Sequence, residues 1–231
     1  MPDPRSAEQD AVLQVEVWSD VVCPWCYIGK RRLEGAIADD PGEIRIIHRA
    51  FQLDPDARTE GKRTIEVLAD KYRLSQQQAV QMMDEVTGVA SSVGLRYQLA
   101  QTITGNTFDA HRLLLWAQEQ GKGQDLLEAV YASYFTQGKP VFTADELLPI
   151  AEQVALDADA AQAVLAGDAY RPEVQRDQQE AARIGANGVP LFVIDGRIGI
   201  QGAQPSDVLR RALAQVRQDR LGVDSNAEEG T

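Results

Sequence analysis

Cysteine and histidine are scarce in this chain. It has 231 residues but only two cysteines and two histidines. A small secreted scaffold held together by disulfides would carry more cysteines. The two that are present, Cys23 and Cys26, lie three positions apart. In a reducing compartment that spacing points to catalysis or metal binding.

Basic charge is also in short supply. The chain carries 23 Lys and Arg residues against 35 Asp and Glu residues, a formal net charge of −12. Nucleic-acid-binding proteins need a basic stripe that displaces counterions from phosphates. Anionic membrane surfaces attract basic segments in the same way. The acidic balance therefore argues against both kinds of partner.

Long hydrophobic runs are lacking too. No apolar stretch approaches the roughly 20 residues that cross a bilayer, and residues 1–10 lack the apolar segment of a secretory signal. We therefore expect a cytoplasmic protein. Hydrophobic residues make up 44% and charged residues 25% of the chain. That balance is typical of a globular protein with one or two compact units and a sizeable core.

The first part of the chain predicts a strand, a helix and a second strand. Apolar and polar residues alternate over 13–18, which is typical of a strand. Pro24 suits the first turn of a helix that we expect to end near Ile37. The second strand is expected over 44–51.

The middle of the chain is helical, and its two ends return to one sheet. Residues 64–167 follow helical spacing almost throughout. After them we expect a helix over 172–184, strands over 189–194 and 197–201 joined by a tight Asp-Gly turn, and a final helix over about 205–220. The predicted fold class is α/β: a four-stranded mixed sheet flanked by helices, with a large all-helical insertion.

These elements imply a discontinuous domain organisation. We expect residues 11–61 and 171–220 to build the sheet domain and residues 62–170 to form the inserted helical domain. Because the insertion leaves and rejoins the same sheet, we expect it to form a cap over the cysteine pair. Residues 1–10 and 221–231 lack apolar periodicity, and we expect them to be disordered tails.

The cysteine pair combines chemistry with a matching local structure. Cys23-Pro24-Trp25-Cys26 follows the first strand and opens the first helix. Two thiols at this spacing lie close enough to form a disulfide. The free N–H groups and the positive dipole end of the helix favour a thiolate on Cys23, whose pKa we expect to fall below about 8.5. Cys23 is thus the expected exposed, attacking thiol, and Cys26 the shielded, resolving thiol.

Two other interpretations of the pair stay open. Free cysteines are often buried as small hydrophobic residues without reactivity. A zinc site would need four ligands, and the separations of His48 and His111 from the cysteines fit no zinc-finger spacing. We therefore expect no metal at this site.

The segment around the cysteines resembles a known family. Residues 16–29, Glu-Val-Trp-Ser-Asp-Val-Val-Cys-Pro-Trp-Cys-Tyr-Ile-Gly, are similar to the active-site segment of DsbA-like thioredoxin-fold oxidoreductases, in particular of the FrnE branch. Residues 188–194, Gly-Val-Pro-Leu-Phe-Val-Ile, resemble the cis-proline loop and the strand that face the cysteine pair in thioredoxin folds. The resemblance covers both ends of the chain. It implies a thioredoxin-like fold for the sheet domain and a redox-active Cys23–Cys26 disulfide.

The resemblance also implies a cis bond between Val189 and Pro190, although only about 5–6% of X–Pro bonds in folded proteins are cis. Such a bond would turn the Val189 N–H and C=O toward the thiols. There they would pair with a substrate backbone in the manner of an added strand. The plainer alternative is a loop proline that starts a strand.

Three further residues complete the expected substrate site. Trp25 stands between the cysteines at a helix start, where we expect it to be exposed. Asn106 precedes a predicted helix, and in related glutathione-using enzymes a similar Asn-Thr pair lines the cleft. His111 lies on the apolar side of that helix and would face the cysteine pair, unless it is a half-buried core histidine. We expect His48 to be structural.

The expected function is that of a thiol–disulfide oxidoreductase without a metal or organic cofactor. Its partners would be protein or small-molecule thiols and disulfides, with glutathione or a thioredoxin-like protein to regenerate it. The 2-hydroxychromene-2-carboxylate isomerases and kappa-class glutathione transferases are relatives that replace the nucleophilic cysteine with serine. A glutathione-dependent isomerase or transferase acting on a small aromatic or polyketide-like molecule is therefore the main alternative, and a peptide-binding module is the non-enzymatic one.

Overall fold

A mixed sheet of four strands forms the centre of the protein. The computed structural model describes residues 12–38 and 40–228. The strands lie in the order β2-β1-β5-β6, with β1 parallel to β2 and antiparallel to β5, and β6 antiparallel to β5. Their bounds are Leu13–Ser19 (β1), Ile44–Ala50 (β2), Leu191–Ile194 (β5) and Ile198–Gln201 (β6). The predicted α/β class is confirmed.

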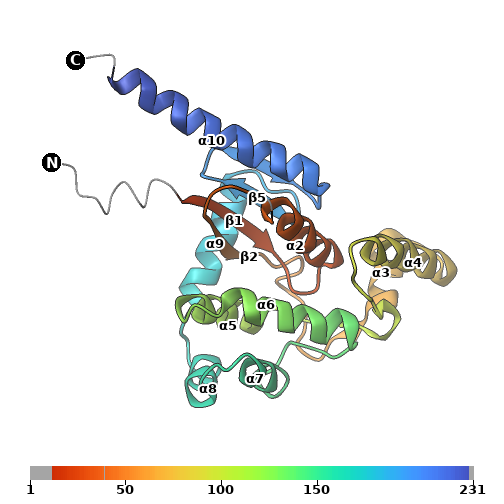
Figure 1. The fold of residues 1–231 in the computed structure, drawn as a ribbon. Helices are drawn as coiled ribbons and strands as arrows, with labels where there is room; N and C mark the ends of the chain where they lie inside the picture. The colour runs from red at the N-terminus through yellow and green to blue at the C-terminus, as the bar shows by residue number, and fades with distance from the viewer. Residues whose placement is uncertain (1–11, 39, 229–231) are drawn as a thin grey trace.

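Helices cover both faces of this sheet (Figure 1). They are α2 (Pro24–Ile37), α9 (Arg171–Arg183) and α10 (Ser206–Glu228). α2 and α10 pack over one face, where Leu13 and Val15 of β1 are fully buried. On the α9 face Trp18 is buried, and its indole N–H donates to the Asp177 carbonyl at 2.9 Å. The alternation along β1 thus separates two layers, since neighbouring side chains of a strand point to opposite faces.

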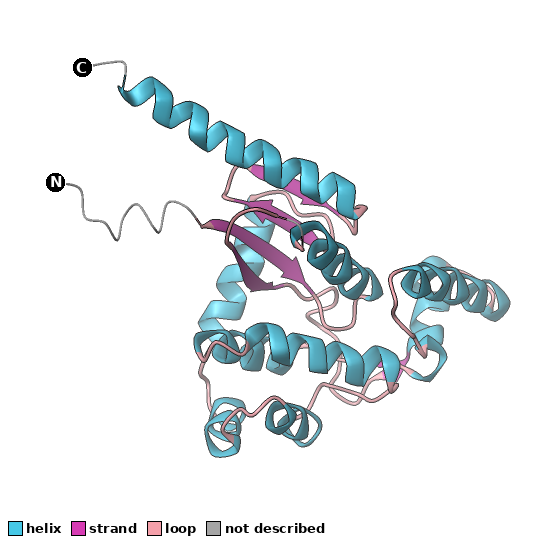
Figure 2. Ribbon diagram, in the orientation of Figure 1, coloured by secondary structure: helices cyan, strands magenta, loops and turns pink. Residues whose placement is uncertain are grey.

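The chain between β2 and α9 is mostly helical, as expected (Figure 2). Its helices are α3 (Thr64–Tyr72), α4 (Gln76–Ser92), α5 (Phe108–Glu119), α6 (Gly123–Tyr131), α7 (Ala144–Gln153) and α8 (Ala158–Ala166). The shorter elements are the 3₁₀ turn η1 (Leu99–Gln101), the π-helical turn η2 (Ala132–Thr136) and the paired strands β3 (Lys62–Arg63) and β4 (Ile103–Thr104). We did not expect the β3–β4 pair, because two residues are too few to show an alternation.

The larger hydrophobic core lies between this insertion and the start of α2. It contains apolar side chains of the insertion together with Cys23, Cys26 and Tyr27. The rings of Tyr27 and Tyr131 stack with centroids 4.8 Å apart. The insertion therefore packs directly on the end of α2 that carries the cysteines. The division of the chain into two domains stays a prediction.

The last helix is longer than the sequence predicts. We expected it to end near Arg220 and to be followed by a disordered tail, but α10 extends to Glu228. Once a helix has formed, adding residues costs much less than nucleation, so it continues without an apolar stripe. The tail expected at residues 1–10 lies outside the described residues, as do residues 229–231. No helix in the described part of the chain is both long and apolar enough to span a membrane.

Candidate active site

The cysteine pair lies at the junction of β1 and α2. Cys23 precedes the first helical residue, Pro24, in an extended conformation, and its side chain makes no capping hydrogen bond. The Cys23 N–H donates to the Asp20 carbonyl at 3.1 Å, and the Cys26 N–H donates to the Cys23 carbonyl at 3.0 Å. Both cysteines are free thiols. The sulfur of Cys23 thus lies at a helix N-terminus, where the dipole favours negative charge.

Cys23 is more enclosed than the sequence predicts, whereas Cys26 is shielded as expected. The expectation that Cys23 is exposed is wrong, since its exposed fraction is 4%, against 2% for Cys26. Tertiary contacts cover it, because the Val189 carbonyl and Tyr97 of the insertion lie against the same buried cluster. The exposed residue of the motif is Trp25, with 39% of its surface accessible. Trp25, and neither sulfur, is thus the part of the motif that faces solvent.

The surroundings of Cys26 stabilise its protonated form. Burial, together with the hydrogen bond and the charge of Cys23, raises the pKa of the Cys26 thiol well above its usual value. A hydrogen bond from the Asp20 backbone acts in the opposite direction without reversing the shift. Cys26 therefore needs a proton acceptor before it can react as a thiolate.

The loop before β5 lies against the cysteine pair. The Val189–Pro190 peptide bond is cis. The Cys23 thiol donates to the Val189 carbonyl with an Sγ–O distance of 3.6 Å. Gly29 of α2 allows this approach, because a Cβ there would lie 2.9 Å from Cγ of Pro190 and 3.1 Å from the Phe192 ring. Residues far apart in the chain thus place a backbone carbonyl beside the first sulfur.

His111 lies between His48 and Asp20, and no hydrogen bond of the described residues joins it to either cysteine sulfur. Its Nδ1 is 3.4 Å from His48 Nε2, and its Nε2 is 3.4 Å from Asp20 Oδ1. All three side chains are buried, and His111 has no exposed surface, so direct substrate contact would require the site to open. Burial, and then the charges of His111 and Arg49, lower the pKa of His48 well below its usual value.

Asn106 uses its whole side chain to hold a loop. Its Oδ1 accepts from the Phe108 N–H at 2.9 Å and from the Gln52 side-chain amide at 3.1 Å. Its Nδ2 donates to the carbonyls of Pro55 and Ala57, both at 3.1 Å. The side chain thus joins the loop after β2 to the start of α5. A role for Asn106 in binding substrate stays a prediction.

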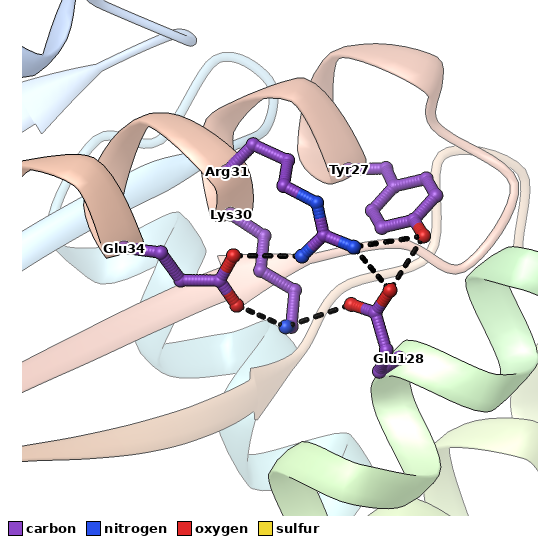
Figure 3. A network of polar contacts seen from close by, with 5 residues as sticks. All are labelled: Tyr27, Lys30, Arg31, Glu34 and Glu128. Atoms are coloured by element: carbon purple, nitrogen blue, oxygen red, sulfur yellow. Dashed lines mark hydrogen bonds and ion pairs between the residues drawn. The ribbon is translucent and has the colours of Figure 1, made fainter. Parts of the chain in front are cut away.

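An ion-pair network joins α2 to the insertion (Figure 3). Glu128 of α6 accepts from the Tyr27 hydroxyl at 2.6 Å and from Lys30 Nζ at 2.9 Å, and it pairs with Arg31. Lys30 and Arg31 also pair with Glu34 on α2. Burial alone would raise the pKa of Glu128, but hydrogen bonds from Arg31, Tyr27 and Lys30 lower it to about 2. This network fixes α6 to the helix that carries the cysteines.

A small cavity lies beside Cys26. Its volume is about 20 Å³, which is room for one water molecule. Besides Cys26, the polar side chains in its lining are Ser19, Lys30, Glu34, His48, Gln124 and Tyr131. Within the described residues, no three His, Cys, Asp or Glu side chains are placed to hold one metal ion.

Sequence reasoning missed several side chains that shape this site. Asp20 had an available signal, since it lies in the turn directly before Cys23. Tyr97 donates its hydroxyl to the Pro24 carbonyl at 2.7 Å, and Tyr131 lines the cavity beside the second thiol. Both tyrosines come from the insertion, and no local pattern places them near the cysteines.

Comparison with known proteins gives close and distant relatives. A crystal structure of a protein from Streptomyces coelicolor, described as a probable DsbA oxidoreductase, is 42% identical with a TM-score of 0.84, over 88% of this chain and 89% of that one. The uncharacterized protein YwbO of Bacillus subtilis (strain 168) is 26% identical over 211 residues, which are 90% of this chain and 99% of that protein.

A structure of a 2-hydroxychromene-2-carboxylate isomerase is 15% identical with a TM-score of 0.66, over 91% of this chain and 98% of that one. At that identity the likeness shows a shared fold alone. The model of the DSBA-like thioredoxin domain family matches residues 14–214. The expected DsbA-like thioredoxin fold is therefore confirmed. Since the match runs from the first strand into the last helix, the chain belongs to the family of DSBA-like thioredoxin domains.

Proposed function

We propose that this protein is a thiol–disulfide oxidoreductase that exchanges and isomerises disulfides through Cys23 and Cys26. The observation that carries the proposal is the placement of the pair. One thiol precedes α2, the other lies in its first turn, and the Val189 carbonyl accepts from the first. Family membership and the 42% identical protein described as a probable DsbA oxidoreductase support it.

In the proposed reaction, the Cys23 thiolate attacks one sulfur of a substrate disulfide. A disulfide forms between Cys23 and the substrate, and the other substrate sulfur leaves as a thiolate. Cys26 then loses its proton and attacks the Cys23 sulfur. The Cys23–Cys26 disulfide forms, and the second substrate sulfur leaves. The substrate has gained two electrons and the protein has lost two; the reverse sequence oxidises a substrate dithiol.

The two sulfurs differ in a way that suits this order of events. The helix N-terminus favours negative charge at Cys23. Burial raises the pKa of Cys26 well above its usual value, so Cys26 stays protonated until the mixed disulfide has formed. Cys26 therefore does not compete as the first nucleophile.

The substrate surface in this proposal is Trp25, exposed beside the pair, together with the backbone of Val189. A peptide would bind there as an added strand. Partners are protein or small-molecule thiols and disulfides, with glutathione or a thioredoxin-like protein as the regenerating reductant. Placement in the FrnE branch, based on residues 16–29, and a cytoplasmic setting belong to the same proposal.

Matched cysteine variants test it. Wild type should catalyse the reduction of insulin by dithiothreitol, and both Cys23→Ala and Cys26→Ala should lose this activity. With oxidised glutathione, Cys26→Ala should accumulate a mixed disulfide at Cys23, visible by mass spectrometry, while Cys23→Ala should not. Each variant removes one buried thiol, so each controls for the packing change in the other.

Two outcomes would replace the proposal. Full activity of Cys26→Ala toward a small aromatic substrate with glutathione would favour the isomerase or transferase alternative, which needs a single nucleophile. Undiminished peptide binding by a variant without either thiol, in a wild type that has no exchange activity, would favour a binding module.

A further inference from the structure

Three buried polar atoms around the cysteine pair lack a hydrogen bond. In the part of the chain that the structure describes, the fully buried side-chain atoms without one are Asp20 Oδ1, His111 Nε2 and Tyr131 Oη. Native proteins pair nearly all such atoms, so each exception needs an explanation. Two of these atoms lie 3.4 Å apart, and the third belongs to Tyr131, a residue that lines the cavity beside Cys26. Their concentration at one place points to a role in the chemistry of the pair.

A row of buried side chains leads to the first two of these atoms. Ser19 Oγ is 3.3 Å from His48 Nδ1, His48 Nε2 is 3.4 Å from His111 Nδ1, and His111 Nε2 is 3.4 Å from Asp20 Oδ1. The two imidazole rings are 12° from parallel with centroids 5.6 Å apart. Because their nitrogens are much closer than their centroids, the rings meet edge to edge, as an N–H···N contact requires.

The partners determine which way the protons point. The Asp20 carboxylate only accepts, so His111 carries its proton on Nε2 and accepts at Nδ1. His48 then donates from Nε2 and accepts at Nδ1 from the Ser19 hydroxyl. The lowered pKa of His48 keeps its ring neutral, which this arrangement needs. The proton of each imidazole in the row thus lies on the nitrogen nearer Asp20, whose other oxygen accepts from the Leu53 N–H at 2.7 Å.

The Ser19 end of the row lies at the cavity beside Cys26. Ser19, His48 and Cys26 line the same cavity, which has room for one water molecule. Tyr131 is a further residue of its lining. Cys26 is buried and must lose a proton before it can attack. The cavity and the row of side chains together provide a route from Cys26 to Asp20.

We propose that Ser19, His48 and His111 carry the proton of Cys26 to Asp20 when the mixed disulfide is resolved, an inference that rests on the exchange reaction proposed above. The Cys26 S–H bond breaks, and its proton crosses the cavity to Ser19. Ser19, His48 and His111 each receive one proton and pass one on, and Asp20 becomes a carboxylic acid. The Cys26 thiolate gives its electron pair to a new bond with Cys23. When the pair is reduced again, the proton returns from Asp20 to Cys26.

The charged side chains around this row already form ion pairs with one another. Arg49, next to His48 on β2, pairs with Glu16 and Asp177. At the cavity, Lys30 and Glu34 pair with each other. Glu34 is the competing proton acceptor, because it lines the same cavity. Its oxygens are occupied by Lys30 and Arg31, whereas Asp20 Oδ1 has no hydrogen bond.

Rapid-quench kinetics with oxidised glutathione test the proposal. Mass spectrometry follows glutathionylated Cys23 and its conversion to the internal disulfide, in wild type and in the amide variants Asp20→Asn and His111→Gln. These amides keep a polar side chain but cannot relay a proton. Asp109→Asn removes a carboxylate from the same helix as His111, outside the row, and is the matched control. Glu34→Gln tests the competing acceptor.

We expect resolution to slow about 100-fold in Asp20→Asn and His111→Gln near pH 6. Their rates should rise about tenfold per pH unit as hydroxide takes over, and should approach wild type in alkaline solution. The double variant should be no slower than either single one, because both interrupt one route. Asp109→Asn should match wild type. Glutathionylation of Cys23, the first step, should be unchanged in every variant.

Several results would overturn the relay. If the variants resolve the mixed disulfide more slowly by the same factor at all pH values, Asp20 and His111 act only on the structure. If His111→Gln resolves the mixed disulfide at the wild-type rate, the proton does not pass through the row. This result would hold even if Asp20→Asn failed to fold. If only Glu34→Gln resolves the mixed disulfide more slowly, the proton acceptor is Glu34 and not Asp20. Failure of the proposed function looks different, since wild type itself would then show no resolution that depends on Cys26.

Discussion

Replacing Glu128 by glutamine removes the negative charge through which the insertion pairs with α2, and it changes the shape of the side chain little. The carboxylate of Glu128 accepts from Tyr27 and Lys30 and pairs with Arg31, so one side chain of α6 holds three of α2 (Figure 3). The amide in Glu128→Gln keeps one acceptor oxygen but loses the charge. Lys30 and Arg31 are then left with Glu34 as their carboxylate partner.

The pKa of Glu128 sets the size of the effect. Lowering it from 4.5 to about 2 corresponds to at most about 3–4 kcal/mol of stability. The side chain is 34% exposed, so solvent screening reduces this figure. We expect Glu128→Gln to lower the free energy of unfolding by about 1–2 kcal/mol at neutral pH.

The pH dependence has a definite sign. A carboxyl whose pKa is lower in the folded state stabilises the fold fully above its unfolded pKa, near 4.5, and loses that contribution as the pH falls toward about 2. The glutamine variant has no such group. The difference between wild type and variant should therefore be constant from neutral pH down to about pH 5 and should shrink below it.

Urea denaturation followed by tryptophan fluorescence measures this difference, at neutral pH and at about pH 3. Glu34→Gln is the matched control. Glu34 pairs with the same Lys30 and Arg31 but within α2, and such neighbouring pairs contribute only about 0.3–0.5 kcal/mol. An equal loss in the two variants, or a Glu128→Gln difference that does not change between neutral and acidic pH, would refute the reasoning.

Three further outcomes follow from the site. Gly29→Ala should lower the free energy of unfolding, measured in urea, by about 1–3 kcal/mol, because its Cβ would meet the Pro190 loop. The control Gly88→Ala should be neutral or stabilising, because a Cβ there has nothing within 4 Å. Equal effects of the two variants would contradict this reasoning. In Cys23→Ser, iodoacetamide should label Cys26 only in strongly alkaline solution, because burial raises the pKa of Cys26. Rapid labelling at neutral pH would contradict the assignment of Cys26 as the thiol that stays protonated. Trp25→Ala should change stability by no more than about 0.5 kcal/mol yet lower kcat/KM for peptide disulfides; unchanged catalysis would remove Trp25 from the substrate surface.

Local patterns in the sequence are sufficient to predict most of the fold. The helix expected from Pro24 to about Ile37 has those bounds, and the four strands of the sheet appear where alternation and the Asp-Gly turn indicate them. These features depend on neighbours along the chain, because strand alternation, helix capping and turn formation act over a few residues. The reactive pair is predictable for the same reason, since Cys23 and Cys26 share one helical turn.

Contacts across the fold decide what surrounds that pair. Cys23 is buried because a carbonyl 166 positions away lies against its sulfur, and His48 meets His111 across 63 positions. Asn106 holds a loop instead of lying free, because the chain after β2 turns back to it. No periodicity or spacing encodes such meetings. They arise when the sheet order and the packing of the insertion bring separate segments together, and they place a buried polar row behind a pair of thiols that the sequence alone predicts.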